Sequence, residues 1–217
     1  MRPTALALGF VLAAAPAAAR AQDAEAIVGR SARVYQSLSS LKADFTQRID
    51  DSLIGTYDSR GEVMQAGQNQ LSMRFADPAG DAIVVDGRQV WVYTPSTAPG
   101  QVIRMPIPTG AMYGFNVLSW ILDRPSERYR MRYLRADRAA GVMTDVVELI
   151  PLSSELPFTR AVVWLGRDDG LPRRLEISER RGGTRTITLS RLRPNVALPD
   201  SAFAFTVPAG VRIVDQR

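Results

Sequence analysis

The sequence contains no cysteine and no histidine. Without cysteine the chain can form no disulfide, and it cannot carry the thioether-linked lipid of a bacterial lipoprotein. Without histidine it cannot build a Ser-His-Asp triad, a Cys-His pair, an HExxH zinc site or a histidine general base. The metal ligands that remain are carboxylates, which suit Ca²⁺ or Mg²⁺ rather than Zn²⁺. These absences favour a binding protein over an enzyme, and we expect no catalytic residue, cofactor or metal.

Residues 1–21 have the pattern of a cleaved signal peptide. A positive second residue precedes an apolar run at 4–15, which is too short to span a membrane, and residues 19–21 (Ala-Arg-Ala) fit the small residues before a cleavage point. A second possible cleavage point follows residues 17–19. We expect an exported mature chain that begins at Gln22. Its formal net charge falls from +5 to +3 because two arginines leave with the signal.

The remaining residues 22–217 predict a single domain that is mainly β with a few helices. Helical periodicity appears at 24–40 and again at 111–122, an apolar segment bounded by glycine and proline. Elsewhere alternate residues are apolar, as in strands that bury one face. Turn signals stand at 86–87 (Asp-Gly) and 168–170 (Asp-Asp-Gly). The expected strands are 41–46, 71–75, 82–86, 89–94, 129–133, 142–147, 158–166, 171–179, 184–192 and 203–207, with 95–110 as loops.

This order of elements indicates an antiparallel meander that forms one strongly curved sheet or barrel. Two apolar helices on such a sheet have two possible roles. They can fill the curved face and give a packed core, or they can cover it loosely and leave a cavity for an apolar guest. Periodicity does not distinguish these two structures, so both remain open.

Three segments, in this order, carry a resemblance to a known family. Residues 41–47 (LKADFTQ) resemble the family's junction between its first helix and first strand. Residues 77–95, which contain DP, IVVDG and VWVYTP, resemble its central hairpin. Residues 203–211 (FAFTVPAGV) and the final DQR are similar to its C-terminus. The chain thus resembles the LolA family of periplasmic outer-membrane lipoprotein carriers over nearly all of its mature length.

The resemblance implies an incomplete antiparallel β-barrel of about ten or eleven strands, covered by a helical lid, that holds the acyl chains of lipoproteins in an apolar cavity. It also implies a monomer in the periplasm that receives lipoproteins from an inner-membrane ABC transporter of the LolCDE type and passes them to an outer-membrane receptor of the LolB type. A receptor of that type is itself a lipoprotein, so the missing cysteine favours the carrier. The expected cavity residues are Tyr35, Leu38, Phe45, Leu71, Met73, Phe75, Trp91 and Tyr93, and the expected lid residues are Met112, Phe115, Leu118, Trp120, Ile121 and Leu122.

One position departs from the family. Its best-known members have an Arg-Pro pair whose arginine holds the lid shut, and the matching residues here are Ala66 and Gly67. The latching residue is therefore not transferred. Arg60 and Arg74 are the candidate substitutes, and the alternative is that both are solvated surface residues.

Two other functions remain as alternatives. A hydrolase with paired carboxylates needs two acidic side chains that converge, but Asp145 and Glu148 stand three apart on one expected strand and so point to opposite faces. A module that binds a glycolipid, or that scaffolds a protein partner, could use the same curved sheet. Exposure of Trp91 and Trp120 beside polar groups would favour a sugar ligand.

Overall fold

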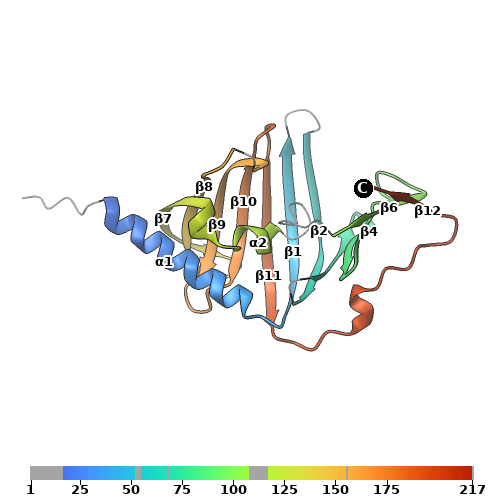
Figure 1. The fold of residues 1–217 in the computed structure, drawn as a ribbon, viewed down its shortest axis with the longest axis horizontal. Coiled ribbons are helices and arrows are strands. Elements are labelled where there is room, and N and C mark those ends of the chain that lie inside the picture. The colour runs from blue at the N-terminus through green and yellow to red at the C-terminus, as the bar shows by residue number, and fades with distance from the viewer. Residues whose placement is uncertain (1–16, 52–54, 68, 108–116, 155, 217) are drawn as a thin grey trace, which may run out of the picture.

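A single twelve-stranded sheet forms the body of the protein in the computed structural model, which describes residues 17–51, 55–67, 69–107, 117–154 and 156–216 (Figure 1). The strands lie in the order β12-β6-β5-β4-β3-β2-β1-β11-β10-β9-β8-β7, so the sheet stays open with edges at β12 and β7. Neighbours are antiparallel except β12, which runs parallel to β6. The strands are β1 Ser40–Asp51, β2 Gly55–Ala66, β3 Gln70–Asp77, β4 Ala79–Asp86, β5 Gln89–Tyr93, β6 Gln101–Pro106, β7 Tyr129–Ala139, β8 Val142–Pro151, β9 Phe158–Gly166, β10 Pro172–Glu179, β11 Thr184–Pro194 and β12 Arg212–Asp215. The prediction of a mainly β fold with an incomplete antiparallel sheet is confirmed, with twelve strands in place of ten or eleven.

Both predicted hairpins are present because their turn signals are local. Gly87 has φ 91° and begins the turn between β4 and β5, where the Asp86 carboxylate accepts hydrogen bonds from the backbone N–H groups of Arg88 and Gln89 at 2.8 Å. Gly170, with φ 70°, ends the turn between β9 and β10. A left-handed φ at these positions is readily adopted by glycine, which explains why the two signals located the turns correctly.

The first strand lies in the middle of the sheet. β1 pairs with β2 on one side and with β11 on the other, with Phe45 opposite both Gly61 and Leu189. The sheet therefore consists of two meanders, β2 to β6 and β7 to β11, that are joined through β1. Within each meander, strands that are neighbours in the sheet are also consecutive in the chain.

The helices lie on one face of the sheet, which we call the inner face; the opposite face is the outer face. Helix α1 (Ala17–Gln36) crosses β7, β8 and β9, and the short helices α2 (Val117–Ile121) and α3 (Pro125–Arg128) lie on the same side (Figure 1). The predicted helix at 24–40 is confirmed but displaced toward the N-terminus. The expected cleavage point before Gln22 lies within α1, and cleavage there stays a prediction.

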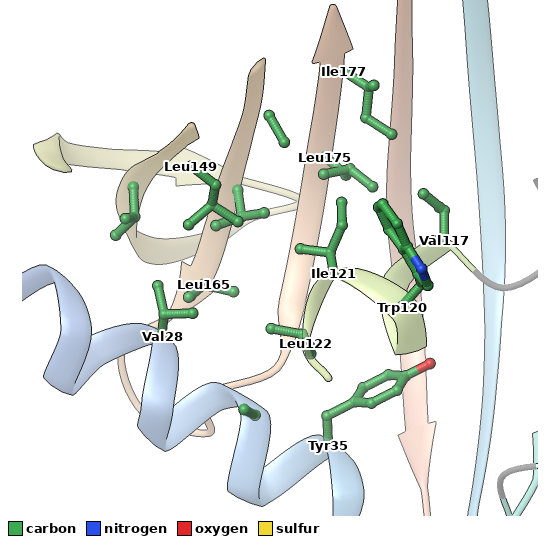
Figure 2. Packing of buried hydrophobic residues seen from close by; sticks show 14 of the residues in the cluster. Val28, Tyr35, Val117, Trp120, Ile121, Leu122, Leu149, Leu165, Leu175 and Ile177 are labelled. Atoms are coloured by element: carbon green, nitrogen blue, oxygen red, sulfur yellow. The ribbon is translucent and has the colours of Figure 1, made fainter. Parts of the chain in front are cut away.

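A packed core fills the space between α1, α2 and the inner face of β7 to β11 (Figure 2). Val28 of α1, Ile121 of α2 and Phe158 of β9 are fully buried. The Phe158 ring packs edge-on against Trp120 with centroids 5.3 Å apart, and it stacks on Tyr129 at 6.2 Å. This half of the inner face thus has the packed-core structure that the sequence left open.

Two segments, one after β11 and one after β5, differ from the sequence predictions. Residues 203–207 were expected to form a strand, but a 3₁₀ helix (Asp200–Phe203) and an extended, unpaired segment occur there. Ala202 and Phe203 pack on Met64 of the outer face. The apolar alternation of residues 203–207 therefore comes from a segment that packs on the sheet without being one of its strands. The expected loop at 95–110 contains β6, whose backbone pairs with β5 and β12.

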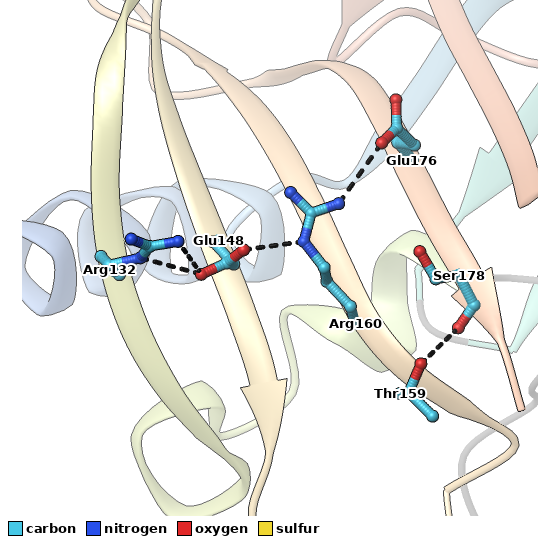
Figure 3. Close-up of polar contacts among 6 residues, drawn as sticks. All are labelled: Arg132, Glu148, Thr159, Arg160, Glu176 and Ser178. Carbon is cyan, nitrogen blue, oxygen red and sulfur yellow. Dashed lines mark hydrogen bonds and ion pairs between the residues drawn. The ribbon is translucent and has the colours of Figure 1, made fainter.

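The outer face of β7 to β10 carries a row of alternating charges (Figure 3). Glu148 accepts hydrogen bonds from Arg160 at 2.7 Å and Arg132 at 2.9 Å, and Arg160 reaches Glu176 at 3.5 Å. Burial opposes ionisation of Glu148, but the two arginines outweigh it, so the pKa of this carboxyl group lies below its ordinary value. The charges of this row are thus paired with one another.

Candidate functional site

An apolar pocket lies on the inner face where β1, β2, β3 and β11 meet α1 and α2. Its free volume is about 60 Å³. Sites for small molecules usually enclose about 300–1,000 Å³, so the pocket is smaller than a typical ligand site. Its walls are Tyr35, Leu41, Phe45, Gln47, Val63, Gln65, Leu71, Met73, Val117, Leu118, Arg185, Ile187 and Leu189.

Strand register explains why residues so far apart in sequence converge here. Val63 stands opposite Met73, and Gln65 stands opposite Leu71. On the other side of β1, Phe45 stands opposite Leu189. Side chains two apart on a strand share a face, so three antiparallel pairings bring one apolar row from each strand to the same side.

One end of the pocket is closed by a hydrogen bond between α1 and β2. The Tyr35 hydroxyl donates to Oε1 of Gln65 at 2.6 Å, and Nε2 of Gln65 donates to the Gly67 carbonyl at 3.0 Å. Both side chains are buried. This contact is adjacent to the positions where the resembling family has its Arg-Pro pair.

Neither candidate substitute for the family's arginine enters the pocket. Arg60 is 3.8 Å from Asp77, and both side chains are about two-thirds exposed. Arg74 is exposed and donates to the Ala204 carbonyl at 3.2 Å, on the outer face. These arginines are surface residues, as the alternative interpretation had it.

The opposite end of the pocket contains Gln47 and Arg185. The Gln47 carboxamide donates to Oγ of Ser59 at 3.2 Å. Nη2 of Arg185 is 3.4 Å from Oε1 of Glu179, while Nε of Arg185 is buried and has no hydrogen-bond partner. The pocket is therefore apolar along its walls and polar at both ends.

The structure places the predicted cavity residues in three locations. Tyr35, Phe45, Leu71 and Met73 line the pocket together. Leu38 and Phe75 are partly buried against the core beside it, where the Phe75 ring packs edge-on against Phe45 at 5.1 Å. The remaining two residues, Trp91 and Tyr93, lie on the outer face of the sheet.

Trp91 and Tyr93 lie on the outer face and do not line the pocket, which corrects the prediction for both. Trp91 stands opposite Val84 and Tyr93 opposite Ala82, whereas the inner-face positions of β5 are Val90 and Val92. The Trp91 ring stacks on Phe205 at 5.5 Å, and its Nε1 donates to Asp86 at 2.9 Å. The tail covers both rings, so their alternation marks a second apolar surface.

The expected lid is divided between the pocket and the core. Leu118 lines the pocket. Trp120, Ile121 and Leu122 are buried in the core cluster, and the Leu122 carbonyl accepts a hydrogen bond from Gln36 at 3.1 Å. Met112 and Phe115 lie outside the described residues. The described part of the lid is thus anchored in the core.

Gln47, Gln65 and Arg185 are the polar pocket residues that sequence reasoning missed. Each occupies the inner-face position of a row that is otherwise apolar, as the register of β1, β2 and β11 shows. A polar residue at an apolar position of an alternating strand is the signal that would have identified them. The apolar pocket residues that were not assigned to the site are Leu41, Val63, Val117, Ile187 and Leu189.

The described residues give no support to the hydrolase alternative. Asp145 is paired with Arg167 at 2.7 Å, and Glu148 lies within the outer-face charge row. No cluster of three His, Cys, Asp or Glu side chains that could hold a metal occurs in the described part of the chain. Within those same ranges, no helix is both long enough and apolar enough to cross a membrane.

Comparisons with known proteins agree with this architecture. The chain is 28% identical over 206 residues to an outer-membrane lipoprotein carrier protein of Chromobacterium violaceum, with 94% of this chain and 96% of that protein covered. It is 26% identical over 192 residues to the protein of the same description from Cupriavidus pinatubonensis, with 82% of each covered. An uncharacterized conserved protein from Thermus thermophilus shares the fold, with TM-score 0.58, 13% identity, and 90% and 100% of the two chains covered.

The model of one protein family spans most of the chain. This family is described as outer membrane lipoprotein carrier protein LolA, and its model matches residues 36–206. That range includes the end of α1, the pocket-forming strands β1, β2, β3 and β11, and the tail as far as the stacked ring of Phe205. On this match, the chain belongs to the LolA family.

Proposed function

We propose that this protein is a carrier that shields the acyl chains of lipoproteins on its inner face and delivers the lipoproteins to the outer membrane. The observation that carries the proposal is the apolar pocket between β1, β2, β3, β11 and α2 in a member of a carrier family. Hand-off between sites is a difference in affinity, so it requires no catalytic residue. A carrier can therefore function without histidine or cysteine, and this chain contains neither.

The small volume of the pocket affects how tightly it can hold cargo. Burial of one CH₂ group contributes about 0.8 kcal/mol, so a long acyl chain gains on the order of 10 kcal/mol. A pocket of about 60 Å³ must open before it admits such a chain. Opening separates apolar side chains that pack on one another in the closed pocket, and the free energy of that separation lowers the net affinity. The carrier can then release its cargo to a receptor that binds the chains better.

The inner face beyond the pocket gives the cargo room. Val92, Met105 and Ile107 are only partly buried and pack on the small apolar cluster of Leu71, Val85 and Val90. An acyl chain that entered beside Met73 could continue along this row. We propose that the pocket and this row together form the binding surface.

The partners and the location follow from the same proposal. The chain has the leader pattern of an exported protein, and its curated relatives are called outer-membrane lipoprotein carrier proteins. We therefore expect it to act in the periplasm as a monomer, loaded by an inner-membrane ABC transporter of the LolCDE type. Delivery would be to an outer-membrane receptor of the LolB type.

A solubility assay tests the proposal. The mature protein is mixed with a triacylated lipoprotein in dilute detergent, the detergent is removed, and the cargo that stays soluble in a 1:1 complex is measured. Met73→Glu places a charge on the pocket wall and should reduce the soluble cargo at least tenfold, because an acyl chain cannot solvate a carboxylate. Met143→Glu is the matched control, since Met143 is an exposed methionine away from the pocket.

Two results would contradict the proposal. Aggregated cargo beside free wild-type protein would mean that the chain binds no acylated cargo under these conditions. Equal losses in Met73→Glu and Met143→Glu would mean that the binding surface lies elsewhere. Thermal unfolding of both variants shows that any loss of binding occurs in folded protein.

A further inference from the structure

Arg185 is the one charged residue among the described residues that line the pocket. It lies near the start of β11, two positions before Ile187, and so shares the inner face with it. Its side chain is about one-quarter exposed. A guanidinium group on the wall of an apolar pocket requires a physical explanation, because partial burial of a charge costs free energy unless the charge is paired.

The pairing of this guanidinium is incomplete. It has five N–H donors, and Nη2 is 3.4 Å from Oε1 of Glu179. Nε, in contrast, is buried and donates to no acceptor. An arginine that merely covers apolar surface with its stem keeps its donors in water. Here one donor is enclosed, so Arg185 offers an unused hydrogen bond at the pocket.

The other residues of the pocket determine how a guest would be oriented relative to Nε of Arg185. Gln47 is the other polar side chain at this end, and the Tyr35–Gln65 hydrogen bond closes the far end. The wall between the two ends is apolar and includes Phe45 and Leu189. A guest with a long apolar part and one oxygen-bearing part would therefore place its oxygen atoms near Arg185.

Glu179 restricts the chemistry of that oxygen. The carboxylate already neutralises the guanidinium, and it would repel a second anion such as a phosphate or a fatty-acid carboxylate. A neutral carbonyl oxygen can accept from Nε without separating the ion pair. An ester that joins an acyl chain to glycerol has such an oxygen directly beside the apolar chain.

We propose that Nε of Arg185 binds the ester carbonyl oxygen of the diacylglyceryl group of the cargo, and so sets how deeply the acyl chains enter. This inference rests on the proposed carrier function. It adds a polar determinant to a site that otherwise selects only for apolar surface. Such a carrier distinguishes ester-linked chains from other hydrocarbons of the same length.

A matched pair of lipids tests the inference. Dioctanoylglycerol has two ester carbonyls, and dioctylglycerol has ether links in their place with chains of the same length. Binding of each lipid to the full mature protein is measured by calorimetry. Arg185→Met should weaken diester binding about tenfold, the effect of losing one hydrogen bond to a charged donor, and should change diether binding less than threefold.

Two further variants separate this role from charge and from folding. Arg60→Met removes the same charge from an exposed arginine of the outer face and should leave both affinities unchanged. Arg185→Lys keeps the charge and most of the apolar stem but has no N–H at the Nε position, so it should also lose diester binding selectively. If Arg185→Met does not fold, the binding of the two lipids to Arg185→Lys tests the inference instead.

The possible outcomes are distinct. A selective loss of diester binding in the Arg185 variants supports the inference. Equal weakening of both lipids, or no change in either, overturns it and leaves the carrier function intact. If the wild-type protein binds neither these lipids nor a triacylated lipoprotein, both proposals fail.

Discussion

The two halves of the inner face are built differently. Over β7 to β11, Val28 of α1 and Ile121 of α2 are completely buried (Figure 2). Phe158 of β9 is also completely buried there. Over β3 to β6, Met73 and Val92 pack on a small cluster and remain partly exposed. The helices described in the structure pack mainly on the first half, so the same sheet supports a dense core on one side and a loosely covered apolar surface on the other.

This difference separates stability from binding. Completely buried apolar groups contribute most to the free energy of unfolding, so the covered half holds the fold together. Half-exposed apolar groups contribute less, and they can exchange water for a ligand without unfolding the protein. The pocket lies at the boundary, where α2 and β11 of the covered half meet β3 of the other.

The largest expected effect is on the covered half. Phe158→Ala removes a fully buried ring that contacts Trp120 and Tyr129, and it should lower the free energy of unfolding by ~3–5 kcal/mol. Urea unfolding followed by circular dichroism measures this loss. A loss below ~1 kcal/mol would mean that the covered half is not the main source of stability.

A smaller effect is expected where the tail covers the outer face. Trp91→Ala removes the stacking on Phe205, the hydrogen bond to Asp86 and the contact with Arg104. Because Trp91 is only partly buried, the loss should be ~2–3 kcal/mol in free energy of unfolding. Cargo binding in the solubility assay should be unchanged. Loss of binding in folded Trp91→Ala would restore the prediction that this residue lines the cavity.

A third variant compares the loosely covered half directly with the core. Met73→Ala truncates a half-buried side chain, so it should lower the free energy of unfolding by only ~1–2 kcal/mol, less than Phe158→Ala. The same urea titration measures both variants. Equal losses would contradict the separation of stability from binding.

The smallest expected effect depends on pH and concerns Glu148. Its folded-state pKa is lowered by Arg160 and Arg132 despite its burial, so the ionised carboxylate stabilises the fold. This contribution is complete above the ordinary value of 4.5 and disappears as the pH falls through the lowered pKa. Glu148→Gln should lose ~1 kcal/mol at pH 7, because Arg132 is largely exposed. The difference between the two proteins should shrink as the pH is lowered below 4.5, and a constant difference would contradict the assignment.

The sequence predicted those parts of the fold that depend on local chemistry. The turns that contain Gly87 and Gly170 were located because glycine and aspartate act within a few residues. β2 was not predicted, since polar residues occupy both faces around Asp58 and Arg60. β6 was assigned to a loop because its apolar alternation is short and flanked by proline and glycine.

The site was predicted only in part, for a geometric reason. Alternation shows that Leu71 and Met73 share a face, but it does not show which face of a strand is the inner one. Trp91 was therefore assigned to the cavity, although it lies on the outer face of its strand. There it packs on Phe205 of the tail, which is more than a hundred residues away in sequence. Arg185 was missed although it shares the alternating row of Ile187 and Leu189, and only the folded register shows that it lies at the same end of the pocket as Gln47.

The join between the two meanders has a consequence for how the protein folds. Each meander can form from neighbouring segments, but β1 must find β11 across most of the chain, with Phe45 pairing with Leu189. Closing so long a loop is entropically costly and slows folding. We expect formation of the β1–β11 pair to limit the folding rate. Since the two strands supply neighbouring parts of the pocket wall, a chain that has not completed this step has no assembled pocket, and acquisition of binding should coincide with the slowest step of folding.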